Sequence, residues 1–417
     1  MSSNSTTQRL KHLVTNVVEQ ITGGSDRSDY VGLEAIESWS GRIRATQTGG
    51  KSGNKFKPGD VLFGKLRPYL AKVAAPKFSG YCSTDALVLR PSTRITTSFL
   101  LYLLIQPQTI SRVSAATYGV KMPRVSWGYI QSLEFSIPCV IQQKLITTFL
   151  DHETSRIDQL VEKKQRLIEL LDEKRHALIT AAVTGQIGLT GNSLAVHADC
   201  ETKKPIKHLF SVSRLMVNPQ SFGEALVFHY SLPEWHETGN GRLQSVKEIQ
   251  SGKIFIEGGE VLVSKLNPEK GVVIHSKKHD VPILCSSEFI VLKAIEGSMH
   301  SRFSYYLMSS SPIRALLEAS VESVTNSHKR ARVDQFLKHR VDVLDFEDQK
   351  YIADFLDVRT SQIDILTQKS RSSIKLLREF RSSLIAAAVT GQIDVNKWSN
   401  TGETDRRLDH IEENSEL

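Results

Sequence analysis

Cysteine is scarce in this chain of 417 residues, and its spacing rules out the commonest cysteine frameworks. The four positions are Cys82, Cys139, Cys200 and Cys285. None of them forms a Cys-x-x-Cys pair or has the spacing of a zinc ligand, which argues against a disulfide scaffold and a zinc ribbon. We therefore expect four reduced thiols in a cytoplasmic protein.

A metal centre is not expected from the histidines either. His275 and His279 are the one pair four residues apart, and Lys277 and Lys278 lie between them. Two ammonium groups at that place would repel a cation, so the segment predicts a solvated turn with no metal.

Long hydrophobic runs are also missing. No apolar stretch reaches the ~18 residues of a membrane span, and residues 1–5 lack the basic and apolar regions of a signal peptide. The hydrophobic content of 40% and the charged content of 24% are ordinary for a globular protein without a membrane partner. The length predicts two or more domains.

The usual catalytic motifs do not occur. A phosphate-binding loop ending at Gly50-Lys51-Ser52 would need glycine at position 45, which is Ala45. The patterns GxGxxG before a helix, Asn/Asp-Pro-Pro-aromatic, HExxH and GxSxG are absent as well. Several independent absences favour a binding role over an enzyme with its own active site.

The positive charge is concentrated at one end of the sequence. Residues 1–148 contain 18 Lys and Arg against 8 Asp and Glu, whereas residues 188–354 contain 20 of each. The first segment thus exceeds the net charge of the whole chain, +8. Such an excess is typical of a polyanion-binding domain, although solubility alone is also compatible with it.

One long segment is written twice. Residues 149–187 and 355–393 share 23 of 39 positions at a constant offset of 206, and both copies end on Ala-Ala-Val-Thr-Gly-Gln-Ile. A doubled helical segment, each copy behind an unlike globular stretch, favours a partner with two-fold character such as duplex DNA.

The globular stretches repeat more weakly and have a mixed, strand-rich pattern. Residues 59–68 and 259–268 correspond, as do 82–85 and 285–288, and Arg124-Val125 is matched to Arg332-Val333. Short apolar runs at residues 60–63 and 86–89 predict strands. Helical spacing of apolar residues predicts helices at residues 97–110 and 303–317.

The repeated segments predict two long amphipathic helices. Each is expected to start just after Pro138 or Asp345 and to end at Gly185 or Gly391. About 40 residues would span roughly 60 Å, so we expect the two helices to pack on each other as an antiparallel coiled coil. The predicted packing positions are Ile157, Val161, Ile168, Leu171, Leu178, Ile363, Ile374, Leu377 and Leu384.

These elements give an α+β protein with pseudo-two-fold organisation. We expect a first recognition domain at residues 1–148, a helix at 149–190, a second recognition domain at 191–348 and a second helix at 349–395. The acidic tail, residues 396–417, is expected to be flexible.

The first candidate site lies at the loop after the strand at 60–63. Lys65, Arg67 and Tyr69 flank a proline there, and Lys265 and Asn267 occupy the corresponding places in the second half. Lys and Arg suit phosphate or guanine, and Asn suits adenine. A surface hairpin with solvated charges is the alternative.

A second cluster lies just before each long helix. In the first half it contains Lys121, Arg124 and Ser126, with Trp127 expected in the core. In the second half it contains His328, Lys329, Arg330 and Arg332, the densest basic patch of the neutral half. We expect DNA contact here, whereas Asp85 and Glu288 are interpreted as caps or turn residues.

Together these features resemble the specificity subunit of type I restriction-modification systems. The most specific marker is the repeated Leu-Ile-x-x-Ala-Val-Thr-Gly-Gln-Ile helix end, and the run at residues 59–68 is similar to the family's target-domain signature. The second copy has Ser264 and Asn267 where the first has Gly64 and Arg67.

The resemblance implies a non-catalytic subunit that reads a bipartite duplex target. Each recognition domain would read one half-site, and the helices would fix the gap between them. The helices would also dock two modification subunits, which bring S-adenosylmethionine and methylate adenine. A motor-nuclease subunit would bring ATP hydrolysis, with Mg²⁺, and cleavage.

Two other classes of function stay open at the level of sequence. A self-contained DNA-modifying or DNA-cleaving enzyme would act without a partner. A coiled-coil scaffold that binds only protein would have no salt-dependent affinity for duplex DNA.

Overall fold

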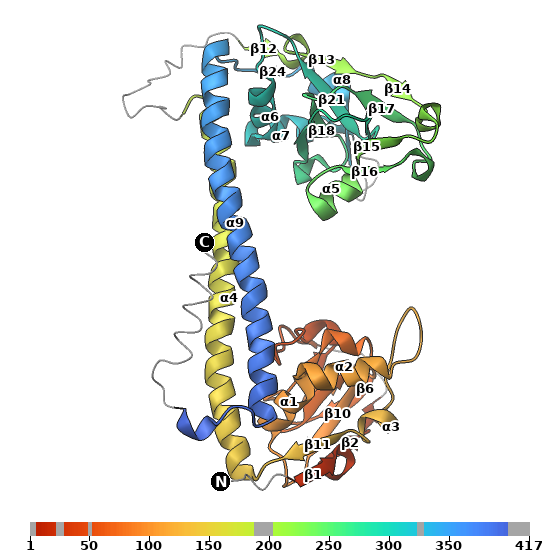
Figure 1. The fold of residues 1–417 in the computed structure, drawn as a ribbon, viewed down its shortest axis with the longest axis vertical. Helices are drawn as coiled ribbons and strands as arrows, with labels where there is room; N and C mark the ends of the chain where they lie inside the picture. Colours follow the sequence, from red (N-terminus) through yellow and green to blue (C-terminus); the bar gives the residue numbers. More distant parts are fainter. Residues whose placement is uncertain (1–5, 22–28, 49–51, 187–202, 323–328, 399–417) are drawn as a thin grey trace. The chain divides into compact units, whose positions relative to one another are not determined.

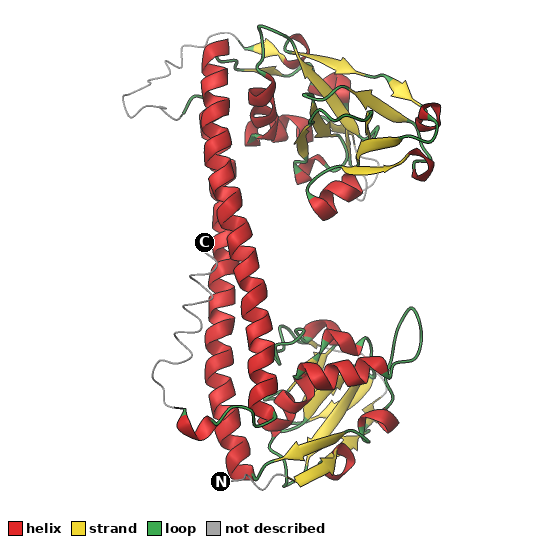
Figure 2. Ribbon diagram, in the orientation of Figure 1, coloured by secondary structure: helices red, strands yellow, loops and turns green. Residues whose placement is uncertain are grey.

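The computed structural model describes residues 6–21, 29–48, 52–186, 203–322 and 329–398. They divide into two compact units. Unit 1 consists of the described residues up to Arg166 together with those from Lys369 onward, and unit 2 is Leu167–Gln368. Both units combine helices with sheets, which agrees with the expected α+β class (Figure 2).

Unit 1 contains two main sheets. The four-stranded sheet is antiparallel, in the order β2 (Val14–Val17), β10 (Ala86–Pro91), β7 (Val61–Gly64) and β8 (Val73–Ala74). The five-stranded sheet has the order β3 (Gln20–Ile21), β6 (Gly53–Phe56), β9 (Gly80–Cys82), β4 (Asp29–Val31) and β5 (Gln47–Thr48). A separate pair joins β1 (Thr6–Arg9) to β11 (Glu134–Ile137).

Unit 2 repeats this topology. Its four-stranded sheet has the order β13 (Phe210–Ser213), β21 (Phe289–Ala294), β18 (Val261–Ser264) and β19 (Val273–His275). Its five-stranded sheet has the order β14 (Met216–Val217), β17 (Lys253–Ile256), β20 (Ile283–Cys285), β15 (Leu226–Tyr230) and β16 (Arg242–Ser245). Two short pairs join β12 (Lys204–Pro205) to β24 (Arg340–Val341) and β22 (Val321–Glu322) to β23 (Arg330–Ala331). The weak sequence repeat of the globular parts therefore reflects a shared sheet order.

The two predicted shorter helices are each broken in two. Unit 1 has α1 (Thr97–Ile105) and α2 (Pro107–Ala115), and unit 2 has α6 (Ser301–Ser309) and α7 (Ser311–Ala319) (Figure 1). Gln106, before a proline, is extended at ψ 145°. A residue that precedes proline avoids the helical region, which is why the single helix expected at residues 97–110 is wrong. Helix α5 (Leu232–Thr238) occurs in unit 2 beyond this shared plan.

The two long helices match their predicted ends. Helix α4 is Val140–Val183 and helix α9 is Phe346–Val389, each of 44 residues. Gly185 and Gly391 follow them with φ of 70° and 76°, the left-handed conformation that glycine adopts without strain. Since the helices begin at residues 140 and 346, the expected domain limits at 149 and 349 lie inside them.

A buried glutamine fastens the start of each long helix. The amide oxygen of Gln143 accepts a hydrogen bond from Thr96 N at 2.8 Å, and its nitrogen donates to Arg94 O and Pro138 O. Gln349 makes the matching bonds to His300 N, Ser298 O and Leu344 O. Both side chains are at most 1% exposed, so each satisfies backbone groups that would otherwise be buried without partners.

A tyrosine joins the recognition domain to its helix in both units. In unit 1, Tyr102 of α1 donates to Asp151 at 2.7 Å and lies 3.2 Å from Thr154 Oγ1. In unit 2, Tyr306 donates to Asp357 and contacts Thr360 in the same way. Burial raises the pKa of the tyrosine hydroxyl in both places, so each stays a neutral donor.

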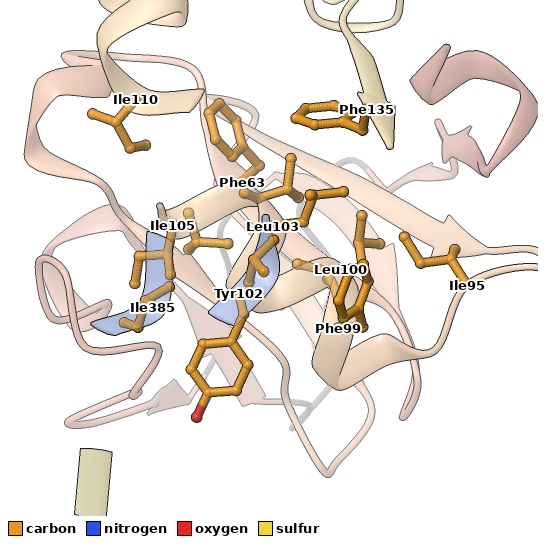
Figure 3. Close-up of a cluster of buried hydrophobic side chains, with 14 of the residues drawn as sticks. Phe63, Ile95, Phe99, Leu100, Tyr102, Leu103, Ile105, Ile110, Phe135 and Ile385 are labelled. Atoms are coloured by element: carbon orange, nitrogen blue, oxygen red, sulfur yellow. The ribbon is translucent and has the colours of Figure 1, made fainter. Parts of the chain in front are cut away.

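The core of unit 1 contains both long helices. Ile157 of α4 lies in one hydrophobic cluster with Leu377, Leu384 and Ile385 of α9 and with the helices of the recognition domain. Figure 3 shows Ile385 in this cluster, close to Ile105 of α1. Trp398, after the short helix at Val395–Lys397, packs edge-to-face on Phe149.

The core of unit 2 contains the other ends of the same helices. Ile179, Ala182 and Val183 of α4 share a cluster with Ile352 and Leu356 of α9. Over both units, six predicted packing positions are buried, namely Ile157, Leu171, Ile363, Ile374, Leu377 and Leu384. The remaining three, Val161, Ile168 and Leu178, are half-buried.

An ion pair between the helices is found in each unit, among the residues that the structure describes. In unit 1, Arg381 Nε donates to Asp158 at 2.9 Å, and in unit 2 Arg175 pairs with Asp364. Asp158 answers Asp364 and Arg175 answers Arg381 at the 206-residue offset of the repeat. The two pairs are therefore the same contact made with the helix roles exchanged.

Candidate nucleic-acid interface

Strand β7 delivers Lys65 and Arg67 into a strained turn. Arg67 has φ 49° and ψ 59° and precedes the 3-10 helix Pro68–Leu70. A left-handed conformation costs a non-glycine residue on the order of 1 kcal/mol, and such strain concentrates at functional sites. Asn267 adopts the same conformation, with φ 50° and ψ 61°, before Pro268–Lys270.

The two predicted clusters of unit 1 lie in one site. Arg67 N donates to Pro123 O at 2.7 Å, and Val125 N donates to Lys65 O at 3.0 Å. Lys65 N in turn donates to Asp85 O at 2.9 Å. Residues 65–67 and 123–125 are therefore bound side by side, although 56 or more positions separate them in sequence.

Arg124 is held by a carboxylate, whereas its basic neighbours are not. Its Nε lies 3.2 Å from Asp85 Oδ1 and its Nη2 lies 3.4 Å from Oδ2. Within the described ranges no carboxylate forms an ion pair with Lys65, Arg67 or Lys121. Arg67 and Lys121 are exposed and Lys65 is half-buried, so three cations remain available to a polyanion.

The remaining candidates of this cluster have structural partners. Ser126 Oγ accepts from Tyr129 N at 3.3 Å and caps helix α3 (Trp127–Ile130). Trp127 packs against the core of unit 1, as expected. Tyr69, a candidate of the first cluster two residues after Arg67, is 49% exposed.

Unit 2 builds the same site from its own residues. Asn267 N donates to Lys329 O at 2.8 Å, and Ala331 N donates to Lys265 O at 2.8 Å. Arg330 Nη2 donates to Glu288 Oε1 at 2.6 Å. The acidic residues Asp85 and Glu288, expected as caps or turn residues, are thus the partners of the arginines Arg124 and Arg330.

This pairing corrects the expected match between the halves. Arg124 corresponds to Arg330, at the same offset of 206 as the long helices, and not to Arg332. Arg332 precedes helix α8 (Val333–Phe336) and is paired with Glu322 at 3.0 Å and Asp334 at 3.1 Å. Those carboxylates raise the pKa of Arg332 and neutralise its charge locally. His328 lies outside the described residues.

Neither a metal-binding cluster nor a membrane-spanning helix is found among the residues that the structure describes. The described residues hold no group of three or more His, Cys, Asp or Glu side chains that could bind a metal ion. None of the helices among them is long and apolar enough to cross a membrane.

The segment from His275 to His279 is not the solvated turn that the sequence predicts. His275 Nε2 lies 2.9 Å from Ser301 Oγ, and the ring of His279 stacks on Phe228 with ring centroids 3.7 Å apart, so the expectation of a solvated turn is wrong.

Sequence comparison gives two curated relatives and a family model. Residues 37–170 match the model of the type I restriction modification DNA specificity domain. The EcoDI specificity subunit of Escherichia coli is 22% identical over 157 residues, 36% of this chain and 35% of that protein. The StySPI specificity subunit of Salmonella potsdam is 19% identical over 359 residues, 82% of this chain and 76% of that protein. The chain thus spans about a third of the first relative's length.

The fold is shared with solved proteins over almost the whole chain. A chain from a study of complex assembly and conformational transition of the type I R-M system has a TM-score of 0.64 at 16% identity. It covers 94% of this chain and 99% of its own. The HsdS subunit from Thermoanaerobacter tengcongensis has a TM-score of 0.50 at 16% identity and covers 94% and 98%. The resemblance to type I specificity subunits that the sequence predicts is therefore confirmed, through the specificity-domain match at residues 37–170 and through the fold.

Proposed function

We propose that this chain is the DNA-reading subunit of a type I restriction-modification complex. The observation that carries the proposal is that one basic loop site is built twice. Arg67 and Asn267 share an unusual backbone conformation, and Arg124 and Arg330 each pair with an acidic residue, Asp85 and Glu288 respectively. Each site would read one half of a bipartite duplex target.

Half-site reading is supported by the chemistry of these loops. Unpaired Lys and Arg side chains suit phosphates, and a fixed guanidinium suits the paired acceptors of guanine. The second site has Asn267 where the first has Arg67, and asparagine suits adenine. Different residues on one backbone frame would give two half-sites of different sequence.

The long helices would act as the spacer between the half-sites. In unit 1 the start of α4 packs with the end of α9, and in unit 2 the reverse holds. That arrangement, with the ion pairs Arg381–Asp158 and Arg175–Asp364, supports an antiparallel coiled coil with a pseudo-two-fold axis. A stiff helix pair holds a distance that a flexible linker would let vary.

The reaction chemistry would come from partners. We propose that two modification subunits dock on the helices and bind S-adenosylmethionine, and that a motor-nuclease subunit uses ATP and Mg²⁺. Exposed apolar side chains on the helices, among them Leu167, Leu170, Ile365 and Leu366, are 45–51% exposed and offer docking area.

The proposal is tested by co-expression with the cognate modification subunit, followed by mapping of methylated adenines in the host genome. A two-part motif with a fixed gap is expected. Binding of the purified complex to a duplex with that motif should weaken steeply with salt. Methylation by this chain alone would favour a self-contained enzyme, and a complex without salt-dependent DNA binding would favour a scaffold.

A further inference from the structure

The loop after α2 presents an apolar tip on a basic base. Three of its five residues from Tyr118 to Met122 are hydrophobic and exposed: Tyr118 at 62%, Val120 at 100% and Met122 at 50%. Val120 makes the tip of a short loop and buries none of its surface. An exposed apolar cluster of this kind is typical of a contact surface, because these side chains contribute no buried area to the core of the fold.

The base of the loop is firmly tied. Tyr118 and Arg124 exchange two backbone hydrogen bonds of 2.9 Å, which close the loop. Gly119, with φ 88°, makes the turn that a side-chain-bearing residue would resist. The ion pair of Arg124 with Asp85 and the bond from Arg67 N to Pro123 O fix the closed end to the candidate site. The apolar tip thus projects from a base that hydrogen bonds and an ion pair hold in place.

The charges around the tip select its partner. Lys121 lies between Val120 and Met122 in sequence, and Lys65 and Arg67 belong to the loop bound to the same base. A protein surface that buried this tip would also have to neutralise these cations. A nucleic-acid duplex supplies phosphates for the cations and base-pair faces for the apolar groups.

We propose that Val120 and Met122 form a wedge that inserts between base pairs of the half-site read by unit 1. This inference rests on the proposed DNA-reading function. Apolar side chains that enter a base step unstack it partly and kink the duplex, so the half-site would be selected in part for ease of deformation.

The test uses the full chain in complex with its modification subunits. Duplexes carry 2-aminopurine at each position of the first half-site except the methylated adenine, and fluorescence reports unstacking. The wild-type complex should brighten the probe at one step. The double variant Val120→Ser/Met122→Ser should lose that signal and bind on the order of tenfold more weakly. A duplex with an abasic site at the same base step should restore the affinity of the double variant.

Controls separate the wedge from other causes. Val18→Ser removes an apolar group that is 65% exposed and lies outside the loop, so signal and affinity should not change. An unchanged 2-aminopurine signal in the double variant would overturn the wedge while leaving the proposed function intact. Loss of the modification subunits with DNA contact retained would assign the tip to a protein partner instead. A wild-type complex that ignores duplex DNA would overturn both proposals.

Discussion

Arg381, near the end of α9, binds Asp158 of α4 and at the same time two backbone carbonyls of the recognition domain. Its Nη1 donates to Trp39 O at 2.7 Å and its Nη2 to Ser40 O at 3.2 Å. Trp39 has φ 64°, a left-handed conformation. The C-terminal helix thus fastens a strained loop of the N-terminal domain across more than 340 residues of sequence.

Substitution of Arg381 should lower the free energy of unfolding far more than substitution of its counterpart, Arg175. Arg381→Met leaves Asp158, 18% exposed, with the half-exposed Arg42 as its partner and frees two carbonyls. We expect a loss of about 3 kcal/mol in the free energy of unfolding. Arg175→Met faces an aspartate that is 61% exposed, so a loss below about 1 kcal/mol is expected. Urea denaturation of both variants checks the difference, and equal losses would contradict it.

We expect the strained backbone at Arg67 to lower the free energy of unfolding while its side chain serves DNA binding. Arg67→Gly relieves the left-handed conformation and should raise the free energy of unfolding by about 1 kcal/mol. The same change removes a cation from the candidate site, so DNA affinity should fall at all sequences and the salt slope by about one. Ala71→Gly, at φ 47° in the same turn, is the control. It should leave DNA binding unchanged, and a parallel loss there would assign the effect to the turn.

Asp85 and Glu288 should act as positioning residues. Asp85→Asn frees the guanidinium of Arg124, so we expect weaker discrimination at one base of one half-site, by about 1–3 kcal/mol. Total affinity should hold or rise because a negative charge near the phosphates is gone. Competition with singly substituted duplexes measures this. Glu288→Gln should act on the other half-site, and relaxation of both half-sites by one variant would refute independent sites.

Burial of His229 should make unit 2 sensitive to mild acid. Desolvation first, then Lys253, lowers the pKa of His229 from 6.5 to about 4 in the folded chain. Between these values the unfolded chain binds the extra proton, so stability is complete above pH 6.5 and is lost as pH falls toward 4. The loss should be about 3 kcal/mol. Urea denaturation at pH 7 and pH 5 should show this dependence in the wild type and in His236→Gln, an exposed control. It should be weaker in His229→Gln, where burial of His275, which also lowers its pKa to about 4, still contributes.

The sequence predicts the long helices well because their signals are local and doubled. The seven-residue spacing of apolar positions, Pro138 at one end and Gly185 at the other determine α4, and the second copy repeats them. The break before Pro107 is equally local, and the rule for residues preceding proline could have found it.

The site is less accessible to sequence reasoning because it forms across distant segments. In the sequence the basic residues form two separate clusters, which backbone hydrogen bonds such as Arg67 N to Pro123 O join in the folded chain. Pairing of Arg124 with Asp85 depends on sheet register, which composition does not contain. For the same reason the sequence does not decide whether Arg330 or Arg332 corresponds to Arg124. Both are exposed arginines in one run, and the strand pairing selects Arg330.

The spacer function of the helices is tested most directly by lengthening both. Four residues are inserted after Gln165 and after Arg371, positions related by the 206-residue repeat, and methylated adenines are mapped across the genome. One added turn of ~6 Å should lengthen the gap by about one or two base pairs and leave both half-sites unchanged. A variant that still methylates the original motif with its original gap would contradict the account.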